Sequence, residues 1–281
     1  MKTITNLQGK WELHNGVEMP YLGLGVYQAE DGDEVINAIH WALDAGYRHV
    51  DTASFYDNEE GVGEAVNSHD VPRGEIFVTS KLWNSDQGYE KTIAAFDKTM
   101  EKLNLDYLDL YLVHWPVKGK YKETWKALEY LYKEGRIKAI GVSNFLQHHL
   151  EDLMQDATIK PMVNQVEFHP WLVQKDLQEF CAKHDIQYQA WSPLMQGNAF
   201  GNETLKKIAD KHGVSEGKVV VRWDLQNGVI TIPKSVKKDH IISNADVFNF
   251  ELSDEEMATI DAMDKHERLG PDPDHVDFGL E

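Results

Sequence analysis

Four residues of the chain carry side chains suited to acid–base chemistry: Asp51, Tyr56, Lys81 and His114. Each lies within, or shortly after, one of three apolar runs typical of buried strands, at residues 49–53, 76–82 and 108–115. In a barrel of parallel strands, the carboxyl ends of the strands meet on one face, and catalytic residues gather there. We therefore expect the carboxylate, phenol, ammonium and imidazole to form one site.

Tyr56 is the expected proton donor of this site. A phenol has a reference pKa of about 10 and is a weak acid at neutral pH unless a nearby cation lowers that pKa. Lys81 can supply the cation, Asp51 can hold Lys81 as a charged partner, and His114 can hydrogen-bond the same ligand atom. Such a site suits carbonyl reduction, in which the oxygen is protonated while hydride reaches the carbon. Because no side chain donates hydride, the pattern implies a nicotinamide cofactor.

Two other interpretations of these residues stay open. Taken singly, a lysine or histidine at a strand end is more often a structural partner than a catalyst, so the prediction depends on all four occurring together in barrel order. Lys81 could also act as a Schiff-base nucleophile, as in an aldolase. A lysine held by Asp51 would stay protonated and be a weak nucleophile, which disfavours aldolase chemistry.

Short apolar runs alternate with amphipathic segments along the chain. Eight strands are predicted, at residues 21–25, 49–53, 76–82, 108–115, 137–143, 162–168, 186–191 and 229–233. Helical patterns lie between or after them, at residues 33–45, 58–67, 89–103, 122–134, 147–155, 174–184, 203–212, 215–227, 238–244 and 253–263. This alternation predicts an α/β fold, a (β/α)8 TIM barrel of parallel strands. A doubly wound open sheet is the alternative, because periodicity alone does not separate the two.

The two ends of the chain do not follow this alternation. Residues 1–20 predict a β-hairpin with an Asn15-Gly16 type I′ turn, and we expect it to close the bottom of the barrel. Residues 264–281 predict an irregular tail, which is either a loose surface segment or a flap over the active site. No Pro/Gly/Ser-rich linker divides the chain, so we expect one domain over residues 1–281.

Composition disfavours several classes of partner. The chain has 281 residues, 42% hydrophobic and 27% charged, which suits one large globular core. Its formal net charge of -19 disfavours nucleic acid and anionic membrane as partners. The sequence contains neither an apolar signal region nor a run of about 18 apolar residues, so a cytoplasmic location is expected. The single cysteine, Cys181, is expected to be a buried structural thiol.

Several other kinds of site fail on spacing. Gly23-Leu24-Gly25 lacks the third glycine of a Rossmann fingerprint, and residues 213–219 lack the spacing and hydroxyl of a phosphate loop. Residues 141–145 lack the closing glycine of a nucleophile elbow. His148 and His149 are adjacent and should diverge on a helix, and no His/Cys/carboxylate set has zinc spacing. No metal site is therefore expected.

Five short runs match the motifs of one known family. Residues 46–63 read GYRHVDTASFYDNEEGVG, residues 137–145 read IKAIGVSNF, and residues 230–236 read ITIPKSV. Residues 79–83 read TSKLW and residues 112–116 read LVHWP. Together these runs resemble the aldo-keto reductase family over nearly the whole chain. The resemblance implies the barrel with its hairpin at the bottom, and a catalytic tetrad of Asp51, Tyr56, Lys81 and His114.

The resemblance also implies which residues bind the cofactor. It places Ser143, Asn144 and Gln165 at the nicotinamide carboxamide and Trp191 against the nicotinamide ring. The remaining implied contacts are the pyrophosphate loop Ser192, Pro193 and Leu194, the 2′-phosphate segment Lys234, Ser235 and Val236, and also Gly25, His240 and Asn244.

The adenosine end departs from the family pattern. Lys234, Lys237 and Lys238 would give an acidic protein a local basic cluster for a phosphate. His240 stands where the family usually has an arginine that stacks on adenine and pairs with the 2′-phosphate, and Ser243 replaces an acidic residue. A neutral imidazole can stack but adds little charge at pH 7. We therefore expect NADPH to be preferred less strongly than in typical members, with NADH use open.

The predicted substrate pocket is aromatic and open. Only about ten residues separate His114 from the helix around Trp125, where animal members carry a longer loop, so small polar carbonyl compounds are favoured. Residues 160–170, KPMVNQVEFHP, and 190–197, AWSPLMQG, are most similar to the bacterial glyoxal/methylglyoxal reductase and 2,5-diketogluconate reductase branch. The pocket candidates are Tyr27, Trp83, Trp115 and the tail beyond Arg268.

The expected activity is NADPH-dependent reduction of small aldehydes, ketones and α-dicarbonyls, such as methylglyoxal or glyoxal, to alcohols. Reduction of 2,5-diketo-D-gluconate or another sugar ketone is the alternative within the family. A cofactor-binding regulatory module without turnover is the alternative from another class, and the intact tetrad argues against it. The expected partner is a small carbonyl substrate, and the resemblance implies a monomer.

Overall fold

The computed structural model describes residues 3–275, and their centre is a sheet of eight parallel strands. Each strand pairs with the next one along the chain, in the order β3 to β10. Bridges from Leu22 to Thr231 and from Gly25 to Lys234 join the last strand to the first. This closure confirms the predicted barrel over the open sheet. The strands are β3 (Leu24–Gly25), β4 (His49–Asp51), β5 (Phe77–Leu82), β6 (Leu108–Val113), β7 (Ile137–Ser143), β8 (Val163–Glu167), β9 (Gln187–Trp191) and β10 (Ile230–Thr231).

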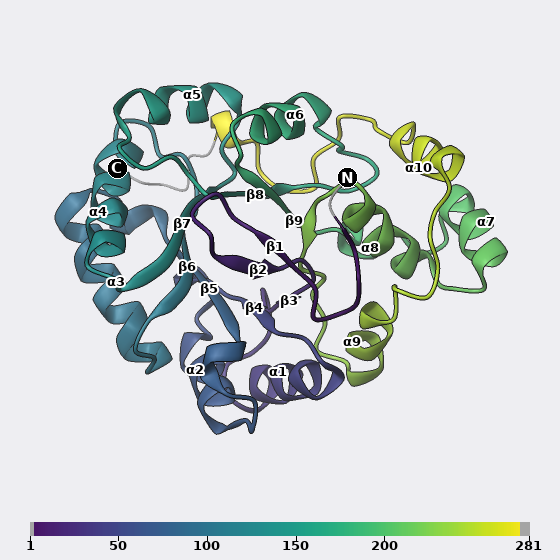
Figure 1. Cartoon of the computed structure of the whole chain (residues 1–281), viewed down its shortest axis with the longest axis horizontal. Helices are drawn as coiled ribbons and strands as arrows, with labels where there is room; N and C mark the ends of the chain where they lie inside the picture. Colours follow the sequence, from purple (N-terminus) through teal and green to yellow (C-terminus); the bar gives the residue numbers. More distant parts are fainter. Residues whose placement is uncertain (1–2, 276–281) are drawn as a thin grey trace.

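Helices surround the barrel (Figure 1), as the alternating pattern predicted. In α1 the buried residues Val35, Ala38, Ile39, Ala42 and Leu43 follow the helical repeat, so one face packs on the sheet. In the described residues, no helix combines the length and hydropathy needed to cross a membrane. The helices are α1 (Asp33–Ala45), α2 (Glu59–Ser68), α3 (Tyr89–Leu103), α4 (Tyr121–Lys133), α5 (Gln147–Asp156), α6 (Lys175–Lys183), α7 (Glu203–His212), α8 (Glu216–Gln226), α9 (Lys238–Ala245) and α10 (Asp254–Asp261).

The long central strands are buried on both faces. Every residue of β5 and β6 is buried, because side chains fill the barrel on one face and helices cover the other. The two strands that close the barrel are shorter than predicted, since β3 and β10 contain only two residues each. Pro233 cannot donate to a ladder, which fits the early end of β10. Cys181 on α6 is buried, and burial raises the pKa of its thiol to about 12, as expected of a structural thiol.

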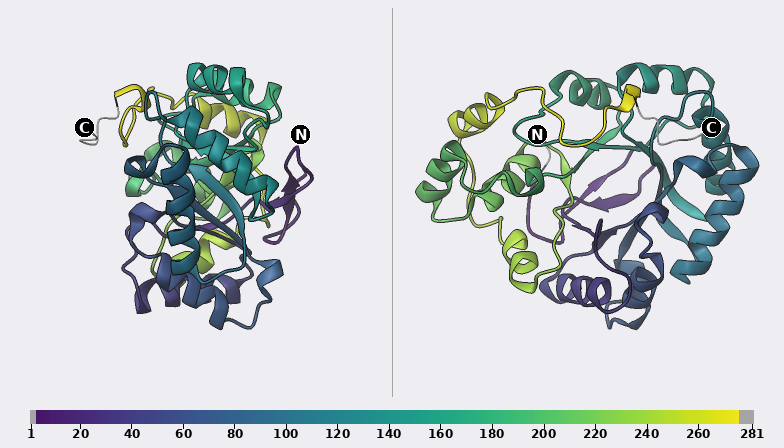
Figure 2. Two further views of the ribbon diagram at one scale, coloured as in Figure 1. Left: turned by 90° about the vertical axis from the view of Figure 1, so that its left-hand side faces the viewer. Right: turned by 180° about the vertical axis from the view of Figure 1, so that it is seen from behind.

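The N-terminal hairpin lies at the end of the barrel opposite the C-terminal segment (Figure 2). Its strands, β1 (Lys10–Glu12) and β2 (Glu18–Pro20), are antiparallel, and Trp11 and Met19 bury their side chains. The predicted type I′ turn is wrong, because φ is positive at Gly16, where it is 84°, but not at Asn15. The amide of Gly16 instead donates to the carbonyl of Leu13, as in a longer loop that ends on a left-handed glycine.

Candidate active site

The four predicted catalytic residues meet at the carboxyl end of the barrel strands. Asp51 ends β4, Lys81 is the penultimate residue of β5, and His114 follows β6. The Nζ atom of Lys81 lies 2.5 Å from Oδ1 of Asp51, 2.8 Å from the carbonyl oxygen of Thr52 and 3.2 Å from Oη of Tyr56. Asp51 and Lys81 are fully buried, whereas the ring of Tyr56 is half-buried.

A short 3₁₀ turn, Ser54–Tyr56, presents the phenol of Tyr56. Buried Asn58 fixes this turn, because its Nδ2 donates to the carbonyls of Val26 and Ala29, at 2.9 and 3.1 Å. The hydroxyl of Thr52 donates to Oδ1 of the same Asn58 at 2.7 Å. The residue after the turn, Asp57, adopts a left-handed conformation with φ 52°, which lets the chain turn directly into α2. The position of Tyr56 is thus set by loop hydrogen bonds rather than by a strand.

Charge and burial act in opposite directions on the three linked groups. Burial would lower the pKa of Lys81, but Asp51 and Tyr56 raise it above its ordinary value. Burial raises the pKa of Asp51, opposed by Lys81 and by a hydrogen bond from Gln165. Burial also raises the pKa of Tyr56, and the Lys81 ammonium opposes that rise. The expectation that Lys81 makes Tyr56 a stronger acid than a free phenol is wrong, because burial outweighs the charge of Lys81 and the net pKa of Tyr56 lies above its usual value.

His114 is suited to bind rather than to protonate a ligand. Burial, and the charge of Lys81, lower the pKa of His114 well below its usual value, so the imidazole is neutral at pH 7. Its ring lies edge-on to the ring of Tyr56, with centroids 5.9 Å apart. A neutral imidazole can hydrogen-bond a carbonyl oxygen that also faces Tyr56, which leaves the phenol as the proton donor.

The predicted nicotinamide contacts form one hydrogen-bonded chain that leads to the catalytic residues. Gln165 Nε2 donates to Oδ2 of Asp51 at 2.7 Å, and Ser143 Oγ donates to the Gln165 carbonyl at 2.8 Å. Asn144 Nδ2 donates to Ser143 Oγ at 3.1 Å, and Trp191 Nε1 donates to Asn144 Oδ1 at 2.8 Å. A half-exposed indole beside buried amides and a hydroxyl fits a nicotinamide ring with its carboxamide.

Apart from Gly25 in β3, the remaining residues predicted to bind the cofactor follow β9 and β10. Ser192 opens the predicted pyrophosphate loop in a left-handed conformation, with φ 55°. Lys234 is exposed after β10, and Ser235 Oγ accepts from the amide of Lys237 at 3.1 Å. A Cβ on Gly25 would lie 2.8 Å from the carbonyl oxygen of Ile232, so this glycine permits barrel closure. The other predicted contacts in this region are Pro193, Leu194, Val236, His240 and Asn244, of which His240 is exposed and Asn244 is buried.

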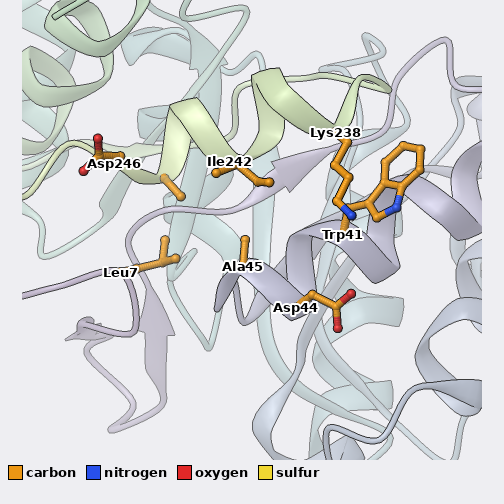
Figure 3. Close-up of a pocket in the computed structure, with 8 residues that line it drawn as sticks. Leu7, Trp41, Asp44, Ala45, Lys238, Ile242 and Asp246 are labelled. Atoms are coloured by element: carbon orange, nitrogen blue, oxygen red, sulfur yellow. The ribbon is translucent and has the colours of Figure 1, made fainter.

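Lys238 takes a different place from the predicted basic cluster. It lines a groove of about 410 Å³ between α1 and α9, beside Trp41 and Asp44 (Figure 3). His240 and Asn244 are on the opposite side of α9 by helical periodicity. This arrangement leaves Lys234 and Lys237 as the members of the predicted basic cluster that lie outside the groove. The groove contains none of the catalytic residues.

Aromatic side chains surround the mouth of the site. Tyr27 is 48% exposed, and its ring centroid lies 4.9 Å from that of Tyr56. Trp83 stacks on Phe55 at 3.8 Å and lies 5.2 Å from the ring of His114. Trp115, also predicted for the pocket, is nearly buried. The sequence reasoning missed Phe55, although an apolar residue directly before the proposed acid in a polar loop is a usable signal.

The described part of the C-terminal tail packs against the barrel, which favours the flap interpretation. The amides of Leu269 and Gly270 donate to the carboxylate of Glu167, and Gly270 lies against the ring of Trp191. Arg268 donates to Oε1 of Gln174 at 3.1 Å. The rest of the predicted tail, residues 276–281, lies outside the described residues. Glu167 and Gly270 are contacts that sequence reasoning did not identify, because they depend on a partner about a hundred residues away.

The prediction that His148 and His149 diverge is wrong. Their Nε2 atoms lie 2.8 and 3.3 Å from Oδ1 of Asp274, because the tail brings this carboxylate between them. Nδ1 of His149 accepts from the amide of Leu146 at 3.2 Å. This acceptor role puts the proton of neutral His149 on Nε2, which favours a hydrogen bond to Asp274 over coordination of a metal ion.

Comparison with known proteins agrees with this geometry. The model of the aldo/keto reductase family matches residues 21–265. The chain belongs to the aldo/keto reductase family. It is 60% identical over 274 residues to glyoxal reductase of Bacillus subtilis (strain 168), a match that covers 98% of this chain and 99% of the relative. It is 46% identical over 267 residues to methylglyoxal reductase DkgA of Escherichia coli (strain K12), covering 94% and 96%.

Solved structures of reductases share the whole fold. An aldo-keto reductase enzyme from a Medee basin deep-sea metagenome library, MGS-M4, superimposes with a TM-score of 0.93 at 46% identity, covering 95% of this chain and 100% of that one. An aspartate-to-alanine mutant of Gox0644 in complex with NADPH gives a TM-score of 0.92 at 46% identity, covering 96% and 99%. As a member of this family, the protein is a nicotinamide-dependent oxidoreductase.

Proposed function

We propose that this protein is an NADPH-dependent reductase of small aldehydes, ketones and α-dicarbonyls such as glyoxal and methylglyoxal. The observation that carries the proposal is the buried ammonium of Lys81, which contacts both Asp51 and the phenol of Tyr56. The glyoxal and methylglyoxal reductases among its relatives support this substrate class.

Each member of the tetrad has a separate role in the proposed reaction. A bound nicotinamide cofactor supplies the hydride that reduces the carbonyl carbon. Tyr56 gives its proton to the carbonyl oxygen, and the charge of Lys81 stabilises the phenolate that is left. Asp51 holds Lys81 in place and keeps it protonated. Neutral His114 hydrogen-bonds the carbonyl oxygen and orients it toward Tyr56.

The residues present also suggest how the cofactor is held. Trp191 would stack on the nicotinamide, while Asn144 and Gln165 would meet its carboxamide. Exposed Lys234 would pair with the 2′-phosphate that distinguishes NADPH from NADH. Because His240 adds little positive charge at pH 7, the preference for NADPH should be modest.

The shape of the site favours small substrates. The chain from His114 to the start of α4 at Tyr121 is short, so this loop adds little wall to the aromatic mouth formed around Tyr27, Phe55 and Trp83. A sugar ketone such as 2,5-diketo-D-gluconate is the second substrate class that such an open mouth admits. An aldolase reaction is disfavoured, because a Lys81 amine with a raised pKa stays protonated.

The direct test follows the loss of NADPH absorbance with methylglyoxal as substrate. Tyr56→Phe should lower kcat by at least about 100-fold, since it removes the proton donor, and should leave NADPH affinity nearly unchanged. A Tyr56→Phe variant that keeps most of its activity would show that the acid is misassigned. Cofactor binding without turnover of any small carbonyl would favour a regulatory module, and borohydride trapping on Lys81 would favour an aldolase.

We further infer that the protein acts as a cytoplasmic monomer on a small carbonyl compound, without nucleic acid or membrane partners. The formal net charge of -19 supports this, because it opposes binding to polyanions and anionic lipid surfaces. Light scattering coupled to size-exclusion chromatography should give a mass of about one chain, 32.2 kDa. A stable mass of twice that value would contradict the inference.

A further inference from the structure

The C-terminal segment is fastened across the barrel end by its backbone. The amides of Lys265 and Glu267 both donate to the carbonyl of Trp171, each at 3.1 Å. Farther along, the amide of Leu269 donates to Oε1 of Glu167 at 2.6 Å, and the amide of Gly270 lies 3.2 Å from Oε2. Figure 2 shows this segment at the barrel end opposite the N-terminal hairpin. The segment therefore has one defined course over the site.

Glu167 is the buried end of this attachment. It is the last residue of β8 and is 1% exposed. The described hydrogen-bond partners of its carboxylate are the two tail amides and Nε2 of His169, which lies 2.9 Å away and is also buried. A buried carboxylate is costly unless donors surround it, so Glu167 depends on the tail amides as much as the tail depends on Glu167. The pair is a specific attachment rather than a passing surface contact.

The attachment holds the tail against the indole of Trp191, the proposed platform for the nicotinamide ring. Glu167 and Trp191 are paired residues on the neighbouring strands β8 and β9. A Cβ added to Gly270 would lie only 2.4 Å from Cη2 of the Trp191 ring, so backbone and indole are in direct contact. On its other edge, Trp191 donates from Nε1 to Asn144 at 2.8 Å. The indole is thus held between Asn144 and the backbone of Gly270.

We propose that Glu167 is a positioning residue for the nicotinamide end of the cofactor. It fixes Leu269 and Gly270 so that Gly270 keeps the Trp191 indole in the orientation on which the nicotinamide ring stacks. The inference deepens the proposed function and rests on it. The described hydrogen bonds of the Glu167 carboxylate go to His169 and to the tail amides beside Trp191, so its effect should be confined to the nicotinamide half of the cofactor.

Calorimetric titration of Glu167→Gln with two ligands tests the proposal. Glutamine keeps the size of Glu167 but removes the negative charge that the tail amides bind. Its NH₂ group also replaces one acceptor oxygen with a donor, which would face N–H donors. We expect the Kd for NADPH to rise about tenfold. The Kd for 2′,5′-ADP, which carries the adenosine and 2′-phosphate but no nicotinamide, should stay within about twofold.

Two further variants keep the test decisive. Gly270→Ala leaves Glu167 intact and pushes a methyl group into the Trp191 ring, so it should also weaken NADPH binding selectively. It decides the outcome if Glu167→Gln does not fold. His266→Asn is the matched control, because His266 is an exposed residue of the same segment with φ 55°, a conformation that asparagine tolerates. Both affinities should be unchanged in the control.

The outcomes separate this inference from the proposed function. Equal weakening of NADPH and 2′,5′-ADP binding would mean that Glu167 only supports the fold. Unchanged NADPH affinity would mean that the tail does not position the Trp191 indole. Either result overturns this inference and leaves the proposed function intact. If the unmodified protein binds no NADPH, the proposed function fails and the inference with it. Selective weakening of NADPH in Glu167→Gln and Gly270→Ala supports the inference.

Discussion

Replacing Lys81 by methionine tests the centre of the proposed site most directly. Methionine retains the apolar part of the side chain but removes an ammonium with three oxygen partners, the closest being Asp51 at 2.5 Å. Since Lys81 and Asp51 are fully buried, water cannot replace the lost partner without rearrangement. Within the described residues, the Asp51 carboxylate would keep only its hydrogen bond from Gln165.

The expected loss in the free energy of unfolding follows from the unpaired Asp51 carboxylate. Breaking a buried ion pair by removing one partner costs about 3–5 kcal/mol, because the remaining charge is uncompensated. Asp51 can reduce the cost by taking up a proton, so its pKa, which burial already raises in the intact protein, should rise further above the unfolded value of about 3.9 once Lys81 no longer opposes that rise. The folded state then holds a proton that the unfolded state releases, and stability should fall as the pH rises above about 4. Lys81→Met should therefore be destabilised more at pH 7 than at pH 5.

Urea denaturation at both pH values measures this effect, and NADPH oxidation measures the catalytic loss. Without Lys81 the phenolate of Tyr56 loses its stabilising cation, and kcat should fall by about 100- to 10,000-fold. The double variant Asp51→Asn/Lys81→Met removes both charges and should be more stable than Lys81→Met alone. A loss below about 1 kcal/mol in the single variant, with turnover kept, would refute the inferred buried pair.

Two further changes follow from the same site. His240→Arg should raise the ratio of kcat/KM with NADPH to that with NADH by about tenfold, through a new charge near the 2′-phosphate; an unchanged ratio would place the 2′-phosphate elsewhere. The kcat for reduction should be flat between about pH 6.5 and 9, because the pKa of His114 is depressed and that of Tyr56 is raised. A step near neutral pH that His114→Gln abolishes would show that the imidazole titrates during turnover.

Local sequence patterns predicted most of the elements. The bounds of α1, α3, α7 and β7 agree with the predicted ranges, because their apolar periodicity runs uninterrupted between turn residues. The predictions were less accurate where tertiary contacts compete with local preference. The strands β3 and β10 are short because their ends turn into the loops that close the barrel, and the hairpin uses a left-handed glycine without the type I′ turn.

The sequence could indicate which four residues meet at the proposed site, because motif and strand position are both local properties. Their ionisation states could not. Whether Tyr56 has a raised or a lowered pKa depends on the balance between burial and the charge of Lys81, which only the folded environment sets. The same holds for His114, which is neutral because burial and the charge of Lys81 lower its pKa well below the ordinary value.

The sequence by itself indicated the barrel, the four residues of the proposed tetrad and a nicotinamide cofactor, because family motifs and the order of residues along the chain are local properties. The tertiary structure decided how the ends of the chain complete the site. Glu167 meets Gly270, and Asp274 meets His148 and His149, across more than a hundred residues. Such contacts follow no local period, because they arise only when closure of the barrel brings the tail across its end. The contact between Gly270 and the Trp191 ring is therefore a property of the fold rather than of any motif.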